Sequence, residues 1–320
     1  MNEMDTALFH RAVGADHLLL DGLVTAREPI YRSPNGKTIE RFRLHGQEAS
    51  CIFKPLTNEE LLGRERWAQR ELLPRLRFRY PRLLAEAAHE DPATYWIILE
   101  DAGSLSHAGE FDVLAHAVRH VSSWQRLPAA IVPAGYAGQK PLLPEVLSVL
   151  ARERSRLTRL LAEQGVSAER IAKLYRLAGQ AASLPDERVV SHGDLHIGNV
   201  ALLDGEAVIL DWEHVQLNSP FWDLYCLLDM THPSFRRTDL GLRRYDLLRL
   251  YEQERDPAGG AGAEEALFAA YDRFACLYSA WFLLLIDRDL EGGDWDRSLL
   301  LLQREEALRA LLSCLDHSAA

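Results

Sequence analysis

The first third of the chain alternates between apolar and polar positions in short stretches that turn-forming residues separate. Residues 18–31, 38–46 and 49–56 each show this pattern, with an Asn-Gly pair and a His-Gly pair between them. A period of two places successive side chains on opposite faces of a strand, and such pairs favour tight turns. We therefore predict three antiparallel strands, and two more that continue the sheet at residues 81–87 and 95–99, around an acidic turn.

Apolar residues recur at helical spacing in one stretch within this region and in most of the chain beyond it. Thr57-Asn58 is a typical helix cap ahead of residues 59–73. A short helix is also expected within residues 1–17. Strands followed by a long helical region indicate the α+β class. The predicted helices beyond the sheet cover residues 111–125, 143–164, 168–182 and most of 243–320, with breaks at 255–263 and 291–294.

Residues 189–213 predict a strand, a polar loop and a tight hairpin. Asp204-Gly205 lies between two apolar runs, which is a strong signal for a two-residue hairpin turn. Counting outward from this turn sets Asn199 opposite the residue that precedes Asp211. Asp194 lies in the loop that leads into the hairpin. We therefore expect three oxygen-bearing side chains to converge at one rim.

This set of side chains suits phosphoryl transfer. An Asp such as Asp194 can position and deprotonate an acceptor hydroxyl. An Asn and a second Asp, here Asn199 and Asp211, can hold Mg²⁺ against the phosphates of a nucleotide. The role of Glu213, either behind the metal ligands or against the substrate, stays open.

Two motifs in this stretch resemble those of the aminoglycoside phosphotransferase and choline kinase family. Residues 192–199 read His-Gly-Asp-Leu-His-Ile-Gly-Asn and resemble its catalytic loop, and Asp-Trp-Glu at 211–213 resembles its metal-binding motif. Ile197 departs from the Pro that is common in that loop. The family consists of small-molecule kinases with the protein-kinase-like fold.

The resemblance implies a fold and several roles. It implies a two-lobed fold: residues 1–101 would be the N-terminal, nucleotide-binding lobe with an antiparallel sheet and one main helix, and residues 102–320 a mostly helical, catalytic and substrate-binding lobe. It implies ATP as the phosphoryl donor and Mg²⁺ as the metal, and it makes Asp194 the catalytic base. Asp223 would hydrogen-bond the backbone of the catalytic loop, and His192 would brace that loop.

Lys54 ends an apolar strand, where a lysine needs either solvent or a partner. On a helical wheel of residues 59–73, Glu65 falls in the middle of the face that Ala68 and Leu72 share. A buried carboxylate without a cation is costly. We therefore predict a Lys54–Glu65 pair, with Glu71 as the alternative, and the resemblance assigns that lysine to the nucleotide phosphates.

Two further segments gain an interpretation from the family. The strand at residues 95–99 runs into a Glu-Asp-Ala-Gly sequence, as the hinge between the lobes does in these kinases. The backbone at Leu99, Glu100 and Asp101 would then hydrogen-bond the adenine edge. The glycine-rich loop that covers phosphates would correspond to residues 33–37, which hold a single Gly. Ser33 and Lys37 in that loop either reach the phosphates or form an ordinary hairpin turn.

Composition narrows the class of protein. The chain has 320 residues, 48% of them hydrophobic, and a net charge of −11, which argues against nucleic acid or an anionic membrane as a partner. The four cysteines are scattered without paired spacing, which indicates reduced thiols. The N-terminus lacks a signal pattern, and the apolar run at residues 274–286 is too short to span a bilayer. We expect a cytoplasmic enzyme that acts on a hydroxyl of a small polar molecule, with cationic amines favoured over acids.

Two alternatives stay open. His192, Asp194 and His196 could belong to a metal hydrolase, although neighbouring glycines disfavour the helix that such spacing needs. A catalytically decayed binder on a kinase scaffold is the other, which only the glycine-poor first loop favours. The acceptor could meet a C-terminal group of aromatic and acidic residues, which could equally be core residues and a solvated turn: Trp222, Tyr225, Tyr278, Trp281, Asp287, Asp289, Glu291, Asp294 and Asp296.

Overall fold

The chain divides into two compact units, Met1–Ser106 with Ala201–Val215, and His107–Val200 with Gln216–Ala320. The computed structural model describes residues 3–33, 35–103, 105, 111–136, 141–232, 235–236, 239–293 and 295–318. Asp294, one of the acidic residues that could meet the acceptor or form a solvated turn, and Pro34 in the first turn lie outside these residues. The predicted lobe boundary at residue 101 stays a prediction.

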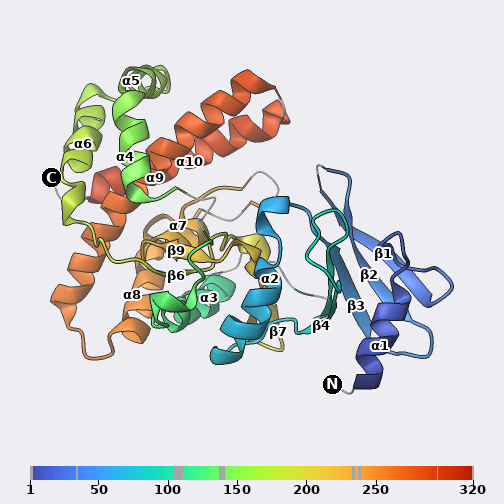
Figure 1. The fold of residues 1–320 in the computed structure, drawn as a ribbon. Coiled ribbons are helices and arrows are strands. Elements are labelled where there is room, and N and C mark those ends of the chain that lie inside the picture. The colour runs from blue at the N-terminus through green and yellow to red at the C-terminus, as the bar shows by residue number, and fades with distance from the viewer. Residues whose placement is uncertain are drawn as a thin grey trace. The chain divides into compact units, whose positions relative to one another are not determined.

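The first unit holds a five-stranded antiparallel sheet in the order β1-β2-β3-β5-β4 (Figure 1). All five predicted strands are confirmed, but the first begins at Val24 instead of residue 18. The backbone before it turns, since Leu20 N–H donates to Ala12 O and Leu23 N–H to Leu20 O. The strands are β1 Val24–Arg32, β2 Thr38–Leu44, β3 Ser50–Pro55, β4 Leu83–Glu86 and β5 Trp96–Glu100.

The two faces of this sheet have different surroundings. In β3, Cys51 and Phe53 belong to an apolar core that includes Phe9 of the N-terminal helix α1 (Glu3–Ala12). Because side chains alternate along a strand, Lys54 points to the opposite face. The register places Ile97 of β5 opposite Lys54, and Ile97 is buried. Lys54 is therefore on the face away from Cys51 and Phe53, beside a buried apolar residue.

The predicted helix at residues 59–73 is broken. Asn58 caps a 3₁₀ turn at Glu59–Leu61, as expected, by accepting a hydrogen bond from Glu60 N–H. Gly63 then takes a left-handed conformation (φ 73°), which ends that turn before a new helix starts. The helical part that follows consists of α2 (Arg64–Trp67), a π-helical turn Ala68–Leu72 and a 3₁₀ turn Leu73–Arg75.

The second unit is mostly helical, as predicted. Its predicted helix at residues 143–164 divides at Glu153, and the next ends at Gly179 instead of residue 182. The last two helices, α9 and α10, pack side by side (Figure 1). A short antiparallel pair, β6 (Val189–Ser191) and β9 (Gln216–Asn218), adjoins the predicted catalytic loop, since β6 ends directly before residue 192. The helices are α3 Phe111–Gln125, α4 Leu143–Arg152, α5 Arg154–Glu163, α6 Ala168–Gly179, α7 Trp222–Leu228, α8 Arg244–Arg255, α9 Ala261–Gly292 and α10 Arg297–His317.

The apolar run at residues 274–286 lies within α9. Among the residues described, α9 is the helix long and apolar enough to cross a membrane, but most of its apolar stretch is buried inside the protein. Such burial is typical of a core helix, as predicted. All four cysteines are buried free thiols, which also agrees with the prediction.

The predicted hairpin is present as strands β7 (Val200–Leu203) and β8 (Glu206–Ile209). Its two turn residues both have left-handed backbones, with φ 54° at Asp204 and 81° at Gly205. Two consecutive left-handed residues are the requirement of the turn that matches the twist of paired strands, and Asp-Gly meets it at low cost.

Candidate active site

Three carboxylates surround the Lys54 ammonium in the first unit. Lys54 Nζ lies 2.6 Å from Glu65 Oε2, 2.5 Å from Asp211 Oδ1 and 2.9 Å from Glu213 Oε2. The predicted Lys54–Glu65 pair is confirmed. The contact of Glu213 with Lys54 was not predicted, although its spacing of two from Asp211 was a usable signal. We call these four residues the Lys54 cluster.

The Lys54 cluster carries more negative than positive charge. Burial works to lower the pKa of Lys54, but the carboxylates of Asp211, Glu213 and Glu65 outweigh it and raise that pKa well above its usual value. Burial raises the pKa of Glu65, and the charge of Lys54 opposes this shift only in part. One ammonium among three carboxylates leaves an excess of negative charge, which a bound cation would offset.

The same carboxylates have the geometry of a metal site. Oxygen atoms of Glu65, Asp211 and Glu213 all lie within 4.8 Å of one another. Mg²⁺ prefers hard oxygen ligands and usually keeps several of its waters, so one or two carboxylates suffice. Asp211, two residues after the end of β8, also has a left-handed backbone (φ 62°). A non-glycine residue held in this region is typical of functional sites.

In the second unit, Asp223 organises the predicted catalytic loop at residues 192–199. Its carboxylate accepts hydrogen bonds from the backbone of His192 (2.9 Å) and Gly193 (3.1 Å), and from Ser191 Oγ (2.7 Å). Trp124 of α3 adds a fourth, at 2.9 Å from its indole nitrogen. Asp223 is fully buried, and these donors satisfy a carboxylate that would otherwise be costly to bury. The expected contact with the loop backbone is confirmed, whereas nothing in the sequence marked Trp124.

The remaining loop residues hold Asp194 in place. His192 is buried and its Nδ1 accepts a hydrogen bond from Asp194 N–H (3.3 Å). The Asn199 side-chain amide donates to Asp194 O (2.9 Å), which directs the Asn199 carbonyl oxygen away from that contact. Trp222 of α7 donates to Gly193 O, and Gly193 has the left-handed backbone (φ 86°) that this turn requires. These bonds fix the backbone around Asp194 and leave its carboxylate partly exposed.

The geometry of the two histidines disfavours a hydrolase. His196 Nδ1 accepts from Gly198 N–H (3.0 Å), and its Nε2 lies 3.8 Å from Asp194 Oδ2. Each ring thus uses Nδ1 as an acceptor for the backbone of the loop. In the described part of the chain, the group of side chains that could share a metal is Glu65, Asp211 and Glu213, which contains no histidine.

The first turn of the sheet is closed by its own hydrogen bonds. Ser33 N–H and Ser33 Oγ both donate to Lys37 O, and Gly36 N–H donates to Ser33 O. Lys37 Nζ reaches Pro92 O at 3.2 Å. Residues 33 and 35–37 therefore form an ordinary hairpin turn, which was one of the two interpretations.

The segment predicted as the hinge is tied to the sheet. Glu100 N–H donates to Arg82 O, so this amide already has a partner. The Asp101 carboxylate accepts from Ser50 Oγ (2.6 Å) and Arg41 Nε (2.7 Å). Burial tends to raise the pKa of Asp101, but these hydrogen bonds lower it overall. Leu99 pairs with Ile52, on the face of the sheet that carries Lys54.

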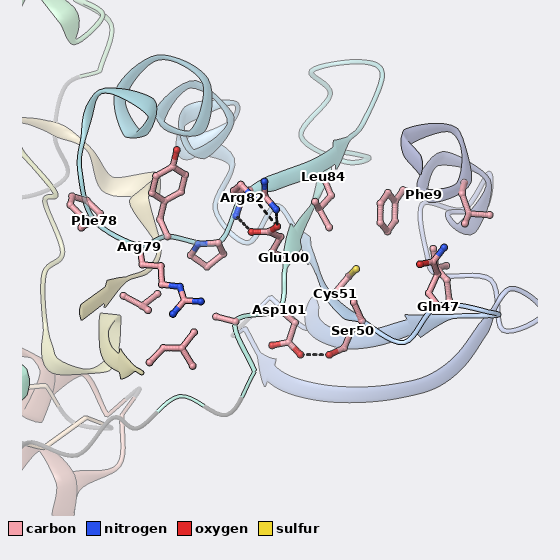
Figure 2. Close-up of a pocket in the computed structure, with 18 residues that line it drawn as sticks. Phe9, Gln47, Ser50, Cys51, Phe78, Arg79, Arg82, Leu84, Glu100 and Asp101 are labelled. Carbon is pink, nitrogen blue, oxygen red and sulfur yellow. Dashed lines mark hydrogen bonds and ion pairs between the residues drawn. The ribbon is translucent and has the colours of Figure 1, made fainter. Parts of the chain in front are cut away.

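A cavity of about 770 Å³ lies behind this segment (Figure 2). Glu100 and Asp101 line it together with Phe9 of α1 and Cys51 of β3. Its lining also includes residues of the segment before β4 and of the hairpin strands β7 and β8, and Lys54 is not among the lining residues. This cavity is therefore separate from the Lys54 cluster.

Comparison with known proteins identifies the family. The profile of the Phosphotransferase enzyme family matches residues 64–275, which is more than half of the chain. The chain belongs to this family. The protein is accordingly a phosphotransferase with an alcohol group as acceptor, a small-molecule kinase. A comparison with curated protein sequences finds no relative.

Solved structures of phosphotransferases share the fold at low sequence identity. A macrolide 2′-phosphotransferase from Brachybacterium faecium is 16% identical, with a TM-score of 0.53 over 97% of this chain and 98% of its own. A choline/ethanolamine kinase family protein from Mesorhizobium loti is 16% identical, with a TM-score of 0.58 and the same coverage. An aminoglycoside 2′-phosphotransferase-IIIa in complex with GDP has a TM-score of 0.60 at 13% identity, over 92% and 94% of the two chains. This phosphotransferase therefore has the protein-kinase-like fold that the motifs implied.

The C-terminal aromatic residues of this phosphotransferase are mostly core residues. Trp222, Tyr225 and Tyr278 are almost completely buried, and Tyr278 stacks on Phe274. Of the acidic residues, Asp287 and Glu291 both pair with Arg156, and Asp296 caps α10 through the N–H groups of Ser298 and Leu299. The structure therefore favours structural roles for these residues, in the core, in ion pairs and in a helix cap, and not the interpretation that they form an acceptor surface.

The predicted site residues fall into two groups. Lys54, Glu65 and Asp211 lie in the first unit, with the hinge residues Leu99, Glu100 and Asp101. Asp194, Asn199, His192 and Asp223 lie in the second. Each group is assembled within its own unit, and the convergence of Asp194, Asn199 and Asp211 stays a prediction.

Proposed function

We propose that this phosphotransferase transfers the γ-phosphoryl group of ATP, with Mg²⁺, to a hydroxyl of a small polar molecule. The observation that carries the proposal is the Lys54 cluster, in which one buried ammonium is held by three carboxylates. A lysine fixed by a carboxylate and close to a metal-binding Asp is what phosphate positioning in this fold requires.

Each residue has a role in this proposal. Lys54 binds nucleotide phosphate, and Glu65 keeps its ammonium in position. Asp211 and Asn199 hold the metal, which neutralises charge on the phosphates when it is bound. Asp194 orients the acceptor hydroxyl and takes its proton as the bond to phosphorus forms. Asp223 and His192 keep the catalytic loop in shape.

The donor is proposed to bind through the backbone near Leu99, Glu100 and Asp101. Glu100 N–H is already bonded to Arg82 O, so the remaining backbone groups of residues 99–102 would serve adenine. One similar structure is a GDP complex, which makes GTP the natural competitor to test. Turnover with ATP and with GTP at equal concentrations, measured by nucleoside diphosphate release, decides between the donors.

The acceptor class follows from the family and not from a single residue. The similar structures include kinases named for macrolides, aminoglycosides and choline or ethanolamine. We therefore propose an aminoglycoside-, amino alcohol- or sugar-like acceptor, with amines favoured over acids. A coupled ADP-release screen over aminoglycosides, amino alcohols, sugars and amino acids tests this. Preference for an acidic acceptor without an amine would overturn the amine preference and leave the kinase assignment intact.

A catalytically decayed binder remains the second candidate, because the first turn commits its own amides to internal hydrogen bonds. The same screen separates the two, since a binder would be stabilised by ATP and magnesium without any acceptor-dependent ADP release. We also propose that neither nucleic acid nor an anionic membrane is a partner, on the grounds of the net charge of −11. The four free thiols support a cytoplasmic location as a further proposal.

A further inference from the structure

Three aromatic rings stack beside Asp194 in the second unit. The ring of His196, in the catalytic loop, lies 4.5 Å from that of His232 and 5.2 Å from that of Phe235, with interplanar angles of 26° and 19°. His232 and Phe235 are themselves 5.0 Å apart. We call these three residues the His196 stack. It joins the catalytic loop to a segment that follows α7.

Phe235 packs directly onto the catalytic loop. A Cβ atom added at Gly198 would lie 2.5 Å from Cγ of Phe235 and 2.7 Å from its Cδ1. Gly198 has no left-handed backbone, so its lack of a side chain matters here for space and not for conformation. The ring therefore lies in contact with the backbone one residue before Asn199.

Two contacts hold Phe235 and the residue that follows it. Phe235 N–H donates to His232 Nδ1 (3.1 Å), and the Arg236 guanidinium pairs with Glu306 of α10. Yet Phe235 is 42% exposed, whereas His196 is almost fully buried. A single exposed Phe is ordinary on a protein surface. An exposed Phe held by stacking, by its own backbone bond and by packing on the glycine next to the proposed metal ligand Asn199 is a built feature.

We propose that Phe235, supported by His196 and His232, is the acceptor-specificity residue of this enzyme, and that it binds the apolar face of a saturated ring bearing the accepting hydroxyl. This inference rests on the proposed function. The C–H face of a sugar or macrocycle is apolar and flat enough to lie on an aromatic ring, while its hydroxyls extend sideways. His196 links this ring to the base, because its Nε2 lies 3.8 Å from Asp194 Oδ2.

This geometry selects among the acceptor classes. When the face of a saturated acceptor ring lies on Phe235, apolar surface of both rings is removed from water. Choline and ethanolamine have no saturated ring, so only their cationic group could contact the Phe235 ring. Kanamycin and a macrolide both offer a saturated ring, and their separate use as probes distinguishes an aminosugar from a macrolactone glycoside.

The test compares variants at Phe235 with kanamycin, a macrolide and choline as acceptors. Phe235→Ala is expected to raise the KM for the ring acceptor about tenfold, the loss of roughly one aromatic stacking contact. The KM for ATP and kcat should stay within about threefold of wild type, since the donor site is not involved. Phe235→Tyr keeps the ring and should restore the low KM. Leu242→Ala removes a similarly exposed apolar side chain of the same unit and should change nothing.

A second measurement tests the packing without any acceptor. Gly198→Ala should lower the midpoint of urea unfolding, because its Cβ meets the Phe235 ring. Phe235→Ala in that background should recover part of the loss. Gly262→Ala, at a position with open space around it, is the control.

The outcomes are distinct. An unchanged acceptor KM in Phe235→Ala, no recovery of Gly198→Ala, or preferred turnover of choline would each overturn the inference and leave the proposed kinase activity standing. If wild type binds ATP but transfers phosphate to no acceptor in the full ADP-release screen, the proposed function itself fails, and this inference fails with it.

Discussion

At the scale of single residues, Asp194 carries the strongest prediction. Its backbone is fixed by His192 and Asn199, and its carboxylate remains partly exposed. A positioned general base contributes on the order of 10²–10⁴-fold to a rate. Asp194→Asn should therefore lower kcat by about that factor and leave ATP affinity within a few-fold, in a coupled ADP-release assay with parallel calorimetry. Asp186→Asn, at an exposed position of the same unit, is the control. Near-normal turnover of Asp194→Asn would refute the assignment.

The Lys54–Glu65 pair makes a prediction about stability. Both side chains are almost fully buried, and Lys54→Met would leave carboxylates there without their cation. Breaking such a pair costs about 3–5 kcal/mol of unfolding free energy, and Glu65→Gln should cost less in the Lys54→Met background than in wild type. Urea unfolding of the two single variants and the double variant measures this coupling.

The control for this double-mutant cycle is a second cycle on the exposed ion pair of Arg79 and Asp204 in the same unit. Exposed pairs contribute about 0–1 kcal/mol, so its cycle should show little coupling. Strictly additive effects at Lys54 and Glu65 would contradict the buried pairing.

Residues that the sequence revealed are those with a local signal. Glu65 could be found because a charge in the middle of an apolar helical face requires a partner, and Lys54 was the available cation. Asp223 came from the family resemblance. Phe235 and Trp124 had no such signal, because their partners lie far away in the sequence and only the folded chain brings them together.

At the scale of elements, the strands were easier to predict than the helix boundaries. Alternation of side chains and turn residues gave all five strands of the sheet, and Asp204-Gly205 gave the hairpin. The helix at residues 59–73 looked continuous because periodicity survives a local break. Gly63 ends the first turn with a left-handed backbone, and Glu153 divides the helix expected at residues 143–164. A periodic pattern reports which face is buried, not whether the backbone bonds are continuous.

The packing of α8 on α9 makes stability depend on pH. Burial raises the pKa of Asp272, in α9, to about 6, and hydrogen bonds from Tyr245 of α8 oppose the shift only in part. In the unfolded chain an Asp titrates near about 4, so between about pH 4 and 6 only the folded state keeps the proton. Stability is therefore lost as pH rises through this window, by about 2–3 kcal/mol for a shift of this size.

Replacing Asp272 by Asn should remove this contribution to the pH dependence of stability. The unfolding free energy of wild type is expected to fall relative to Asp272→Asn as the pH rises from about 4 to 7, in urea titrations at fixed salt. Asp246→Asn, at an exposed position of α8, should follow the wild-type curve. Parallel curves for wild type and Asp272→Asn would show that the pKa of the Asp272 carboxyl is not raised in the folded state.

At the scale of the whole molecule, the family was accessible from a short part of the chain. The motifs at residues 192–199 and 211–213 indicated a phosphotransferase, and the family profile covers residues 64–275. The similar structures share only 13–16% of residues with this chain over more than nine tenths of it. A fold tolerates such divergence when apolar patterning is kept, whereas the acceptor is chosen by a few side chains. The acceptor is accordingly what the sequence could not predict.

The last prediction concerns the binding of nucleotide and metal by the intact protein. A ligand that binds only the folded state stabilises it, by about 2.7 kcal/mol at a concentration of one hundred times its Kd. ATP with Mg²⁺ should therefore raise the thermal midpoint of wild type, and chelation of the metal should remove most of the rise. Asp211→Asn should bind ATP without this dependence on magnesium, because the carboxylate beside Lys54 is the proposed metal ligand. Asp204→Asn is the matched control, since it lies on the same hairpin and Asn accepts its left-handed backbone. An equal magnesium-dependent rise in Asp211→Asn and wild type would exclude Asp211 as a ligand.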